Sequence, residues 1–304
     1  MHEQMYSTEK KYVQAFKRFQ EWCEAMDVSY LPAAPEHVAL YLVDIGLQAA
    51  TAAPIEAASC AIKWAHRKAC LSIPTEHALV SQTVKASQRL LARPAAKKKV
   101  LTLAVLERLC EKFGGESAPL KYVQMLCLLS LGFKGFLRWD NMARLTVADV
   151  EFFECSMTVF IASQKNDQFR EGHLVPIAAT PESPACAVTW MRRFLQESGR
   201  RGLQSKAVLF GKISFGRGKW FVRGEMAYSR ALECFREMLQ EVNESPQEYG
   251  LHSLRSGGVS AALQVPGVSV RLVQRHGGWR HIESMQGYGK EGDAALLSVT
   301  SGLK

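Results

Sequence analysis

The sequence lacks the cysteine patterns that mark a metal site or a disulfide framework. Its eight cysteines form no CxxC pair, and no group of histidines and cysteines has the spacing of zinc ligands. Most of them lie in apolar stretches such as "MLCLLSL", which predicts buried, reduced thiols and an intracellular, reducing compartment. A structural zinc site and a disulfide-stabilised secreted domain are therefore excluded.

Targeting signals and long apolar runs are also missing. The N-terminal "MHEQMYSTEKK" has no hydrophobic segment of the kind that a signal peptide requires, and no apolar stretch reaches membrane-spanning length. There is no internal repeat and no low-complexity tract. With 47% hydrophobic and 22% charged residues, the composition is that of a globular protein without a membrane partner.

Acidic residues are fewer than basic residues. The 38 Lys and Arg residues outnumber 29 Asp and Glu residues, which gives a net charge of +9 at pH 7. Residues 1–99 contain 13 basic and 9 acidic residues, and the remainder contains 25 and 20, so both parts are basic. This distribution favours a protein that grips a polyanion from two sides, although a basic protein without such a partner has the same charge.

Strand patterns are scarce, so we expect a mainly α fold. Apolar residues at helical spacing predict four helices between residues 7 and 93, and Pro35 and Pro54 stand where first-turn prolines belong. The stretch "RPAAKKKV" then breaks the pattern. The predicted parts are a helical domain over residues 1–95, a basic linker over 96–100 and a second domain over 101–304.

The only clear strand patterns in the sequence lie in the second domain, where two of them form a pair. "SMTVFIA" and "HLVPIAA" are β-rich and flank the polar "SQKNDQFREG", which indicates a hairpin. A turn is expected at Gly132 to Gly135, after the apolar "LKYVQMLCLLSLGF", and helices return from Ala185 onward. The expected fold is an N-terminal bundle of four or five helices followed by an α-rich domain with a small antiparallel β-sheet.

Four separated features carry groups suited to a phosphate. They are Arg138 after the glycine turn, Lys165 in the hairpin loop, His252 and Arg255 in "HSLRSGG", and Trp279 and Tyr288 in "RHGGWRHIESMQGYGK". Taken singly, each is more typical of a surface charge, a structural histidine or a core aromatic residue. Their order, and the nine-residue step from Trp279 to Tyr288, together resemble the signature of the tyrosine recombinases of the phage integrase and Cre-like superfamily.

The resemblance covers nearly the whole chain. The first domain is similar to the helical core-binding domain of Cre-like members, and "YSRALECFREML" to the helix that enters the DNA major groove there. In "HSLRSGG", "RHGGWR…GYGK" and the tail "LLSVTSGL", the chain resembles most closely the recombinases of DIRS-type retrotransposons. The resemblance implies the DNA breaking-rejoining fold, double-stranded DNA as partner, and the nucleus for a eukaryotic mobile element or otherwise the cytoplasm.

Metal-free cleavage of a phosphodiester suits this set of residues. Arg138 and Arg255 can clamp the two non-bridging oxygens, on which charge builds during attack. The resemblance makes Tyr288 the nucleophile, which forms a 3′-phosphotyrosyl bond and conserves the energy of the phosphodiester for religation. It implies no metal, no other cofactor and no ATP.

The remaining catalytic roles follow from the resemblance alone. It assigns His252 to handle the proton of the nucleophile, Lys165 to protonate the 5′-oxygen leaving group, and Trp279 to donate its indole N–H to the phosphate. His276, three residues before Trp279, is a rival for that last role, and Arg170 is a weaker rival to Lys165.

The chain departs from the family pattern in one place. Relatives commonly carry a carboxylate three residues after the first arginine, and here that position is Asn141, with Asp140 beside it. The support of Arg138 is therefore in question. The glycines at 257 and 258 remove side chains where a helix could pack close to its neighbour or to DNA, although two glycines could also be an accident of packing.

Several basic residues are candidates for contacts with DNA. They are Lys10, Lys11, Lys63, Arg67 and Lys68 in the first domain, Lys97, Lys98 and Lys99 in the linker, and Arg230 for base recognition. A solvated charged face is the alternative for each of the lysines and for Arg67.

The residues favour the first of three functions, because every core position of the resemblance is filled. The first is an active recombinase that works as a tetramer on two duplexes, with the apolar tail "DAALLSVTSGL" docked on a neighbouring subunit and integration of a mobile element as its purpose. The second is a domesticated DNA-binding protein that has lost catalysis. The third is a relaxing topoisomerase of type IB or a hairpin-forming resolvase, which shares the chemistry.

Overall fold

The computed structural model describes residues 2–93, 98–162, 172–200, 206–216 and 219–286. Lys97, Lys165, Arg170, Tyr288 and the C-terminal tail lie outside these ranges. The chain divides into two compact units, residues 1–96 and 97–304, and each is described by itself. Within the described ranges, the helices fall short of the length and apolar character needed to cross a membrane.

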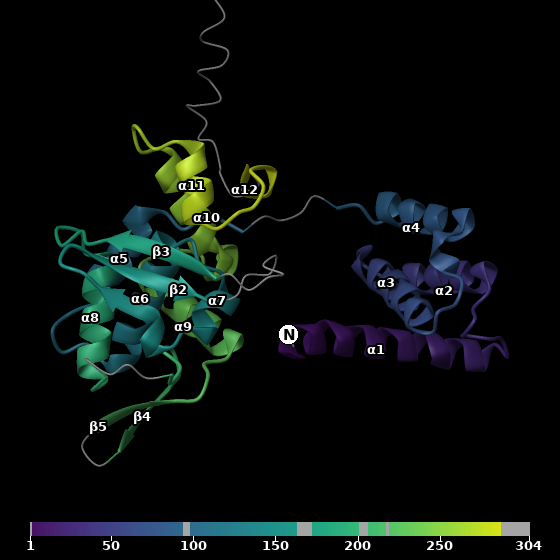
Figure 1. The fold of residues 1–304 in the computed structure, drawn as a ribbon, viewed down its shortest axis with the longest axis horizontal. Coiled ribbons are helices and arrows are strands. Elements are labelled where there is room, and N and C mark those ends of the chain that lie inside the picture. Colours follow the sequence, from purple (N-terminus) through teal and green to yellow (C-terminus); the bar gives the residue numbers. More distant parts are fainter. Residues whose placement is uncertain (1, 94–97, 163–171, 201–205, 217–218, 287–304) are drawn as a thin grey trace, which may run out of the picture. The chain divides into compact units, whose positions relative to one another are not determined.

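Helices alone build the described part of the first unit (Figure 1). Its elements are α1 (His2–Ala25), α2 (Pro35–Gln48), α3 (Ala53–Lys68), the 3-10 helix η1 (Pro74–Glu76) and α4 (Ala78–Leu90). Pro35 and Pro54 stand in the first turns of α2 and α3, as predicted, because a helix leaves the first-turn N–H groups unbonded. The buried side chains at the centre of this bundle include Phe19, Val38, Leu42, Ile55, Ile62 and Val80.

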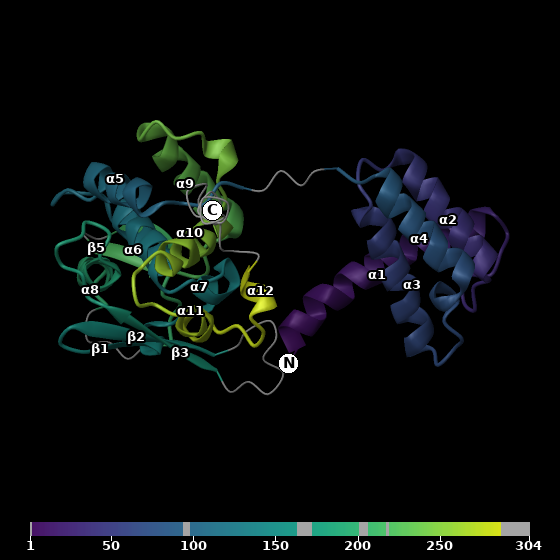
Figure 2. The same ribbon diagram turned by 90° about the horizontal axis from the view of Figure 1, so that it is seen from above.

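The second unit is α-rich and carries two small antiparallel sheets (Figures 1 and 2). Its helices are α5 (Leu103–Phe113), α6 (Leu120–Lys134), α7 (Trp139–Arg144), α8 (Ala187–Glu197), α9 (Tyr228–Glu241), α10 (His252–Leu263), α11 (Val270–His276) and α12 (Glu283–Gln286). Two 3-10 helices, η2 (Val147–Asp149) and η3 (Pro246–Glu248), join them. The strands are β1 (Val150–Phe152), β2 (Ser156–Ile161), β3 (His173–Ala178), β4 (Lys212–Gly216) and β5 (Lys219–Arg223). The mainly helical fold class is confirmed.

Helix α6 is the centre of the second unit. It packs against α5, α8, α9 and α10, and nearly all of its residues are buried, polar Gln124 and Ser130 included. A helix that is apolar on every face is stable only when other elements surround it. Each of its fully buried leucines contributes about 1.5–3 kcal/mol of transfer free energy relative to an exposed position.

The predicted hairpin is confirmed as β2 and β3, which pair in antiparallel register with Val159 opposite Val175. The inward side chains of β2, Met157, Val159 and Ile161, join the core of the unit. Sequence analysis missed β1 and the whole β4–β5 hairpin, which extends away from the helical body in Figure 1.

Two local predictions need correction. The turn expected at Gly132 to Gly135 begins only at Gly135, since α6 continues to Lys134 and the chain reverses at Gly135 and Phe136, whose φ is +50°. Gly132 instead lies where an added Cβ would stand 2.9 Å from Leu254 Cδ1 of α10. The thiols of Cys60, Cys70 and Cys155 are exposed rather than buried, although all eight cysteines are free.

The two glycines of "HSLRSGG" let α10 approach its neighbours closely. A Cβ added at Gly257 would stand 1.8 Å from the carbonyl oxygen of Leu101, and one at Gly258 would stand 2.0 Å from that of Phe133. Both distances are far below van der Waals contact, so any side chain would push α10 away from backbone. The close packing to a neighbour that the sequence suggested is confirmed.

Candidate active site

Arg138 lies at the N-terminus of α7, directly after the reversal at Phe136. It is the residue that caps α7, and its backbone N–H donates to Oδ1 of Asn141 at 3.3 Å. The side chain of Asn141 thus fixes the backbone of Arg138. A carboxylate at position 141 could accept the same hydrogen bond. The guanidinium of Arg138 is half-buried.

Helix α10 carries the other two charged groups. His252 is its first residue, and Arg255 follows one turn later on the same face. Arg255 is only 2% exposed and donates to the carbonyl oxygens of Phe136 and Gly277, the latter at 3.2 Å. Its guanidinium carbon lies 3.8 Å from the centre of the Trp279 ring, a close cation–π contact.

His252 is electrostatically influenced by both arginines. The pKa of His252 lies below its ordinary value, first because the ring is partly desolvated and then because the positive charges of Arg255 and Arg138 oppose its protonation. A lowered pKa favours the neutral imidazole, which is the form that can accept a proton. Such a cluster suits an anion that carries charge on two oxygens.

A tight turn after α11 places Trp279 against this cluster. Gly278 has a φ of +66°, which favours glycine, and a Cβ at Gly277 would stand 1.7 Å from the Trp279 ring. Trp279 is 7% exposed and belongs to a small apolar cluster with Phe136 and Val273. The ring is therefore held by the turn and cannot move away from Arg255 without unpacking.

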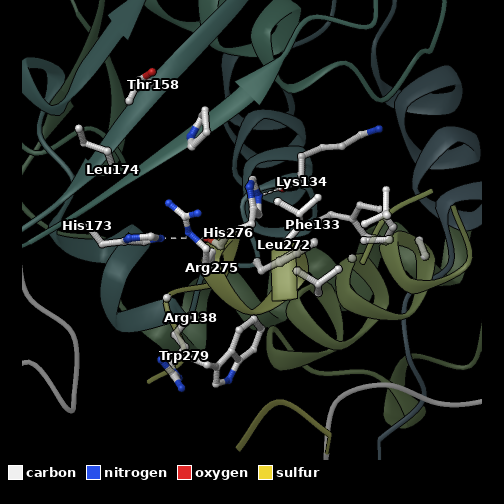
Figure 3. Close-up of a pocket in the computed structure, with 18 of the residues that line it drawn as sticks. Phe133, Lys134, Arg138, Thr158, His173, Leu174, Leu272, Arg275, His276 and Trp279 are labelled. Carbon is white, nitrogen blue, oxygen red and sulfur yellow. Dashed lines mark hydrogen bonds between the residues drawn. The ribbon is translucent and has the colours of Figure 1, made fainter. Parts of the chain in front are cut away.

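His276 is held by a backbone carbonyl and an aromatic ring. Its Nε2 lies 2.9 Å from the carbonyl oxygen of Lys134 (Figure 3). Its ring meets that of Phe136 edge-on, with centroids 4.7 Å apart. His173 of β3 in turn places its Nε2 3.0 Å from the carbonyl oxygen of His276. The pKa of His276 is lowered, chiefly by burial. The sequence analysis missed His173, and no motif in the sequence singles it out.

A cavity of about 1500 Å³ adjoins the cluster (Figure 3). Arg138, Trp279 and His276 line it, whereas His252 and Arg255 do not. Its other walls are mostly apolar and include the exposed side chains of Phe160, Leu174, Val265 and Leu272. The cavity therefore suits an apolar segment better than a phosphate.

The basic candidates of the first unit occupy two neighbouring helices. Lys10 and Lys11 lie on α1, and Lys63, Arg67 and Lys68 lie on α3, which packs against α1. Lys68 pairs with Glu9 and stands 4.9 Å above the Trp64 ring, and Lys63 pairs with Glu76 at 2.9 Å. Lys10, Lys11 and Arg67 are exposed. The structure thus gathers these basic groups on one helix pair.

The candidates of the second unit differ from one another. Arg230 is exposed on the first turn of α9, where it pairs with Glu233 at 2.6 Å. Lys98 donates to the carbonyl oxygen of Gln247, and the ammonium of Lys99 lies 3.3 Å from Glu244. Lys98 and Lys99 are thus engaged by protein groups. Lys97, Lys165, Arg170 and Tyr288 fall outside the described residues.

A protein-family model matches nearly all of the second unit. Residues 99–294, about two thirds of the chain, match the model of the phage integrase family. This chain belongs to the phage integrase family. A curated relative, the integrase/recombinase xerD homolog of Selenomonas ruminantium, is 27% identical over 192 residues, which cover 62% of this chain and 55% of the relative. The match therefore spans about half of the relative's length.

Solved structures share the fold of the family. The XerH site-specific recombinase bound to a palindromic difH substrate has a TM-score of 0.60 at 12% identity, over 96% of this chain and 76% of that one. The Tn1549 transposon integrase in complex with circular intermediate DNA has a TM-score of 0.57 at 14% identity, over 88% and 85%. A lambda integrase dimer bound to a core site has a TM-score of 0.56 at 14% identity, over 96% and 92%.

Proposed function

We propose that this chain is a site-specific tyrosine recombinase that cuts and rejoins double-stranded DNA through a covalent 3′-phosphotyrosyl intermediate. The observation that carries the proposal is the placement of His252 one turn before buried Arg255 on α10, with Arg138 near enough to help lower the pKa of His252. Membership of the phage integrase family supports the same activity.

In the proposed reaction the Tyr288 oxygen attacks the scissile phosphorus. The new bond joins that oxygen to phosphorus, and the bond from phosphorus to the 5′-oxygen breaks. Neutral His252 takes the phenolic proton, and Lys165 gives a proton to the departing 5′-oxygen. Arg138 and Arg255 hold the non-bridging oxygens while negative charge develops on them.

Trp279 completes the phosphate site in this proposal. Its indole N–H is the donor to the phosphate, and its ring keeps the Arg255 guanidinium in place through the 3.8 Å stacking contact. His276 is committed to the carbonyl of Lys134, which supports Trp279 over His276 for the phosphate role.

Basic groups of both units supply the grip on DNA. We assign the backbone contacts of the first unit, as a core-binding domain, to Lys10, Lys11, Lys63, Arg67 and Lys68. Exposed Arg230 on α9 is the candidate for base recognition, since its guanidinium can pair with guanine N7 and O6. The motifs "HSLRSGG" and "RHGGWR…GYGK" support a mobile element of the DIRS type as the source, and integration as the purpose.

The test asks which DNA end becomes covalently attached to the protein when nicked DNA is used as substrate. Duplexes that the wild-type chain selects from a random library are nicked near each candidate phosphate and incubated with the chain without metal, in EDTA. We expect an adduct on the 3′-phosphate side and a free 5′-hydroxyl, since this is the polarity that Lys165 protonation requires. No adduct on any selected duplex, or attachment to a 5′-phosphate, would overturn the proposal.

Product topology separates the related activities. On a plasmid with two selected sites, a recombinase exchanges the flanking segments, a topoisomerase only relaxes the plasmid, and a resolvase leaves hairpin ends. Binding without any adduct is the outcome expected of a domesticated DNA-binding protein.

We also propose that the protein assembles as a tetramer on two duplexes, with the tail "DAALLSVTSGL" covering apolar surface on a neighbouring subunit. The exposed Phe160, Leu174 and Leu272 of the cavity are the described apolar surface that such a segment would cover. Truncation after Gly292 is expected to leave binding of one duplex unchanged and to abolish the four-subunit complex in sedimentation. A truncated chain that still forms tetramers on DNA contradicts this assignment.

A further inference from the structure

The chain segment that enters the second unit is bound along the loop that leads into α10. The backbone N–H of Lys99 donates to the carbonyl oxygen of Glu248 at 2.7 Å, and that of Leu101 donates to the carbonyl oxygen of Ser253 at 3.0 Å. Leu101 is fully buried, and its carbonyl oxygen fills the space that Gly257 leaves open. Residues 98–101 thus touch both the approach to α10 and the helix itself.

Two carboxylates hold this segment from the side, since the ammonium of Lys99 pairs with Glu248 at 3.7 Å as well as with Glu244. Glu244 accepts from the hydroxyl of Tyr249 at 2.7 Å, from Arg108 of α5, and from the ammonium of Lys99 at 3.3 Å. Lys99 also stands 5.5 Å from the centre of the Tyr249 ring. We call Lys99, Arg108, Glu244 and Tyr249 the linker anchor.

The anchor joins a largely buried carboxylate and a buried phenol to two half-exposed cations, Lys99 and Arg108. The side chain of Glu244 is 14% exposed, and Tyr249 is fully buried. The pKa of Glu244 lies below its ordinary value because the hydrogen bond from Tyr249, and then those from Arg108 and Lys99, stabilise the charged carboxylate. The pKa of Lys99 lies above its ordinary value, through hydrogen bonds to Tyr249 and Glu244. Exposed pairs contribute little, whereas a network of this kind holds a defined geometry.

We propose that Glu244 is a positioning residue: through Lys99 and Tyr249 it fixes residues 98–101 against the start of α10 and thereby holds His252 in place. This inference rests on the proposed function for what His252 does. In this proposal Lys99 makes a contact inside the protein rather than with a DNA phosphate, because its ammonium is already held by Glu244. Lys98, bound to the Gln247 carbonyl, reinforces the same connection.

The geometry explains why a change at Glu244 reaches the reaction. Tyr249 lies three residues before His252, and Gly250 N–H donates to Oγ of Ser253 at 3.1 Å, so the short loop has little freedom. Loss of the carboxylate charge weakens the hold on the Tyr249 hydroxyl and on Lys99, whose ammonium keeps only the longer 3.7 Å pair with Glu248. His252 then loses part of its fixed placement beside Arg255, and small misplacements of a catalytic group cost large factors in rate.

The experiment compares Glu244→Gln and Lys99→Met with Glu111→Gln and Lys112→Met. The control residues are adjacent, exposed positions on α5 with the same charges. At saturating selected duplex, we expect adduct formation to slow about tenfold in the two anchor variants, while Kd stays within about twofold of the controls. Lys99→Arg, which keeps the charge and a donor, should restore most of the rate. A general loss of fold would weaken binding and rate together.

Salt dependence distinguishes the two roles of Lys99. A phosphate contact adds about one to the slope of log Kd against log salt, so its removal lowers the slope by about one. We expect Lys99→Met to have the same slope as Lys112→Met. A lower slope with an unchanged rate at saturation would overturn the inference.

Hydrogen exchange tests the anchor without DNA or catalysis. Amides at the start of α10 should exchange faster in Glu244→Gln than in wild type and should be unchanged in Glu111→Gln. Unchanged exchange of α10 overturns the inference even if the wild-type chain forms its adduct. Absence of a wild-type adduct overturns the proposed function instead, and the exchange result then still decides whether the anchor exists.

Discussion

Replacing Tyr288 by phenylalanine is expected to abolish the covalent protein–DNA adduct while Kd for DNA stays within about twofold of the wild-type value. The proposed bond forms through the phenolic oxygen, which phenylalanine lacks. Binding persists because affinity for a phosphate backbone comes from basic groups, and this change removes none of them. Denaturing electrophoresis of trapped reactions measures the adduct, and fluorescence anisotropy measures Kd.

The matched control is Tyr122→Phe on α6. Tyr122 packs against Phe113 at a centroid distance of 4.8 Å and does not line the cavity that adjoins the arginines. This variant should form the adduct at the wild-type rate, which shows that loss of one hydroxyl does not impair the reaction by itself. An adduct that persists in Tyr288→Phe assigns the nucleophile to another residue and contradicts the proposed role.

The rate of adduct formation should also depend on pH through His252. In the proposed mechanism its neutral form takes the proton, so the rate rises as the pH increases through its pKa. That pKa is lowered by desolvation and by the two arginines, which places the midpoint below the ordinary value for histidine. The acidic limb of the profile therefore lies at lower pH than an exposed histidine would give.

The sequence predicts the helices of this fold well because the spacing of apolar residues indicates which face of each helix is buried. The apolar spacing in α1 to α4 and the β-rich runs of β2 and β3 record which faces pack, and those elements are present. Gly132 shows the limit: in sequence it indicates a turn, but in the structure it lets Leu254 and Met142 pack against α6. Glycine has two uses, and only the tertiary neighbours decide between them.

The sequence indicated which residues belong to the candidate site, but not which groups those residues contact. Spacing singles out Arg255 and Trp279, yet nothing local indicates that the guanidinium binds carbonyls of Phe136 and Gly277. The same holds for Lys99: a run of lysines is typical of a DNA contact, whereas the carboxylate that holds its ammonium is 145 residues away. Contacts between distant segments leave no periodic trace in a single sequence.

Three arginine variants separate the chemical role of Arg255 from its structural role. Arg255→Met is expected to slow adduct formation about 10³-fold, since it removes charge-assisted donors from the developing charge on the phosphate. It should also lower the free energy of unfolding by about 2–4 kcal/mol, because two buried carbonyl oxygens lose their donor. Urea denaturation and single-turnover trapping, both well below the melting temperature, measure the two effects.

Replacing Arg138 isolates the effect on rate, and replacing Arg200 isolates the effect on stability. Arg138 is half-buried at the start of α7, so Arg138→Met should slow the reaction about as much and change the free energy of unfolding by less than about 0.5 kcal/mol. Arg200 is 8% exposed and donates to the carbonyls of Leu209 and Val208, so it matches Arg255 in burial and bonding. Arg200→Met should therefore destabilise the fold about as much as Arg255→Met, yet keep the wild-type rate of adduct formation. If Arg200→Met slows the reaction as strongly, the effect at Arg255 is a consequence of instability and its role as a phosphate clamp is wrong.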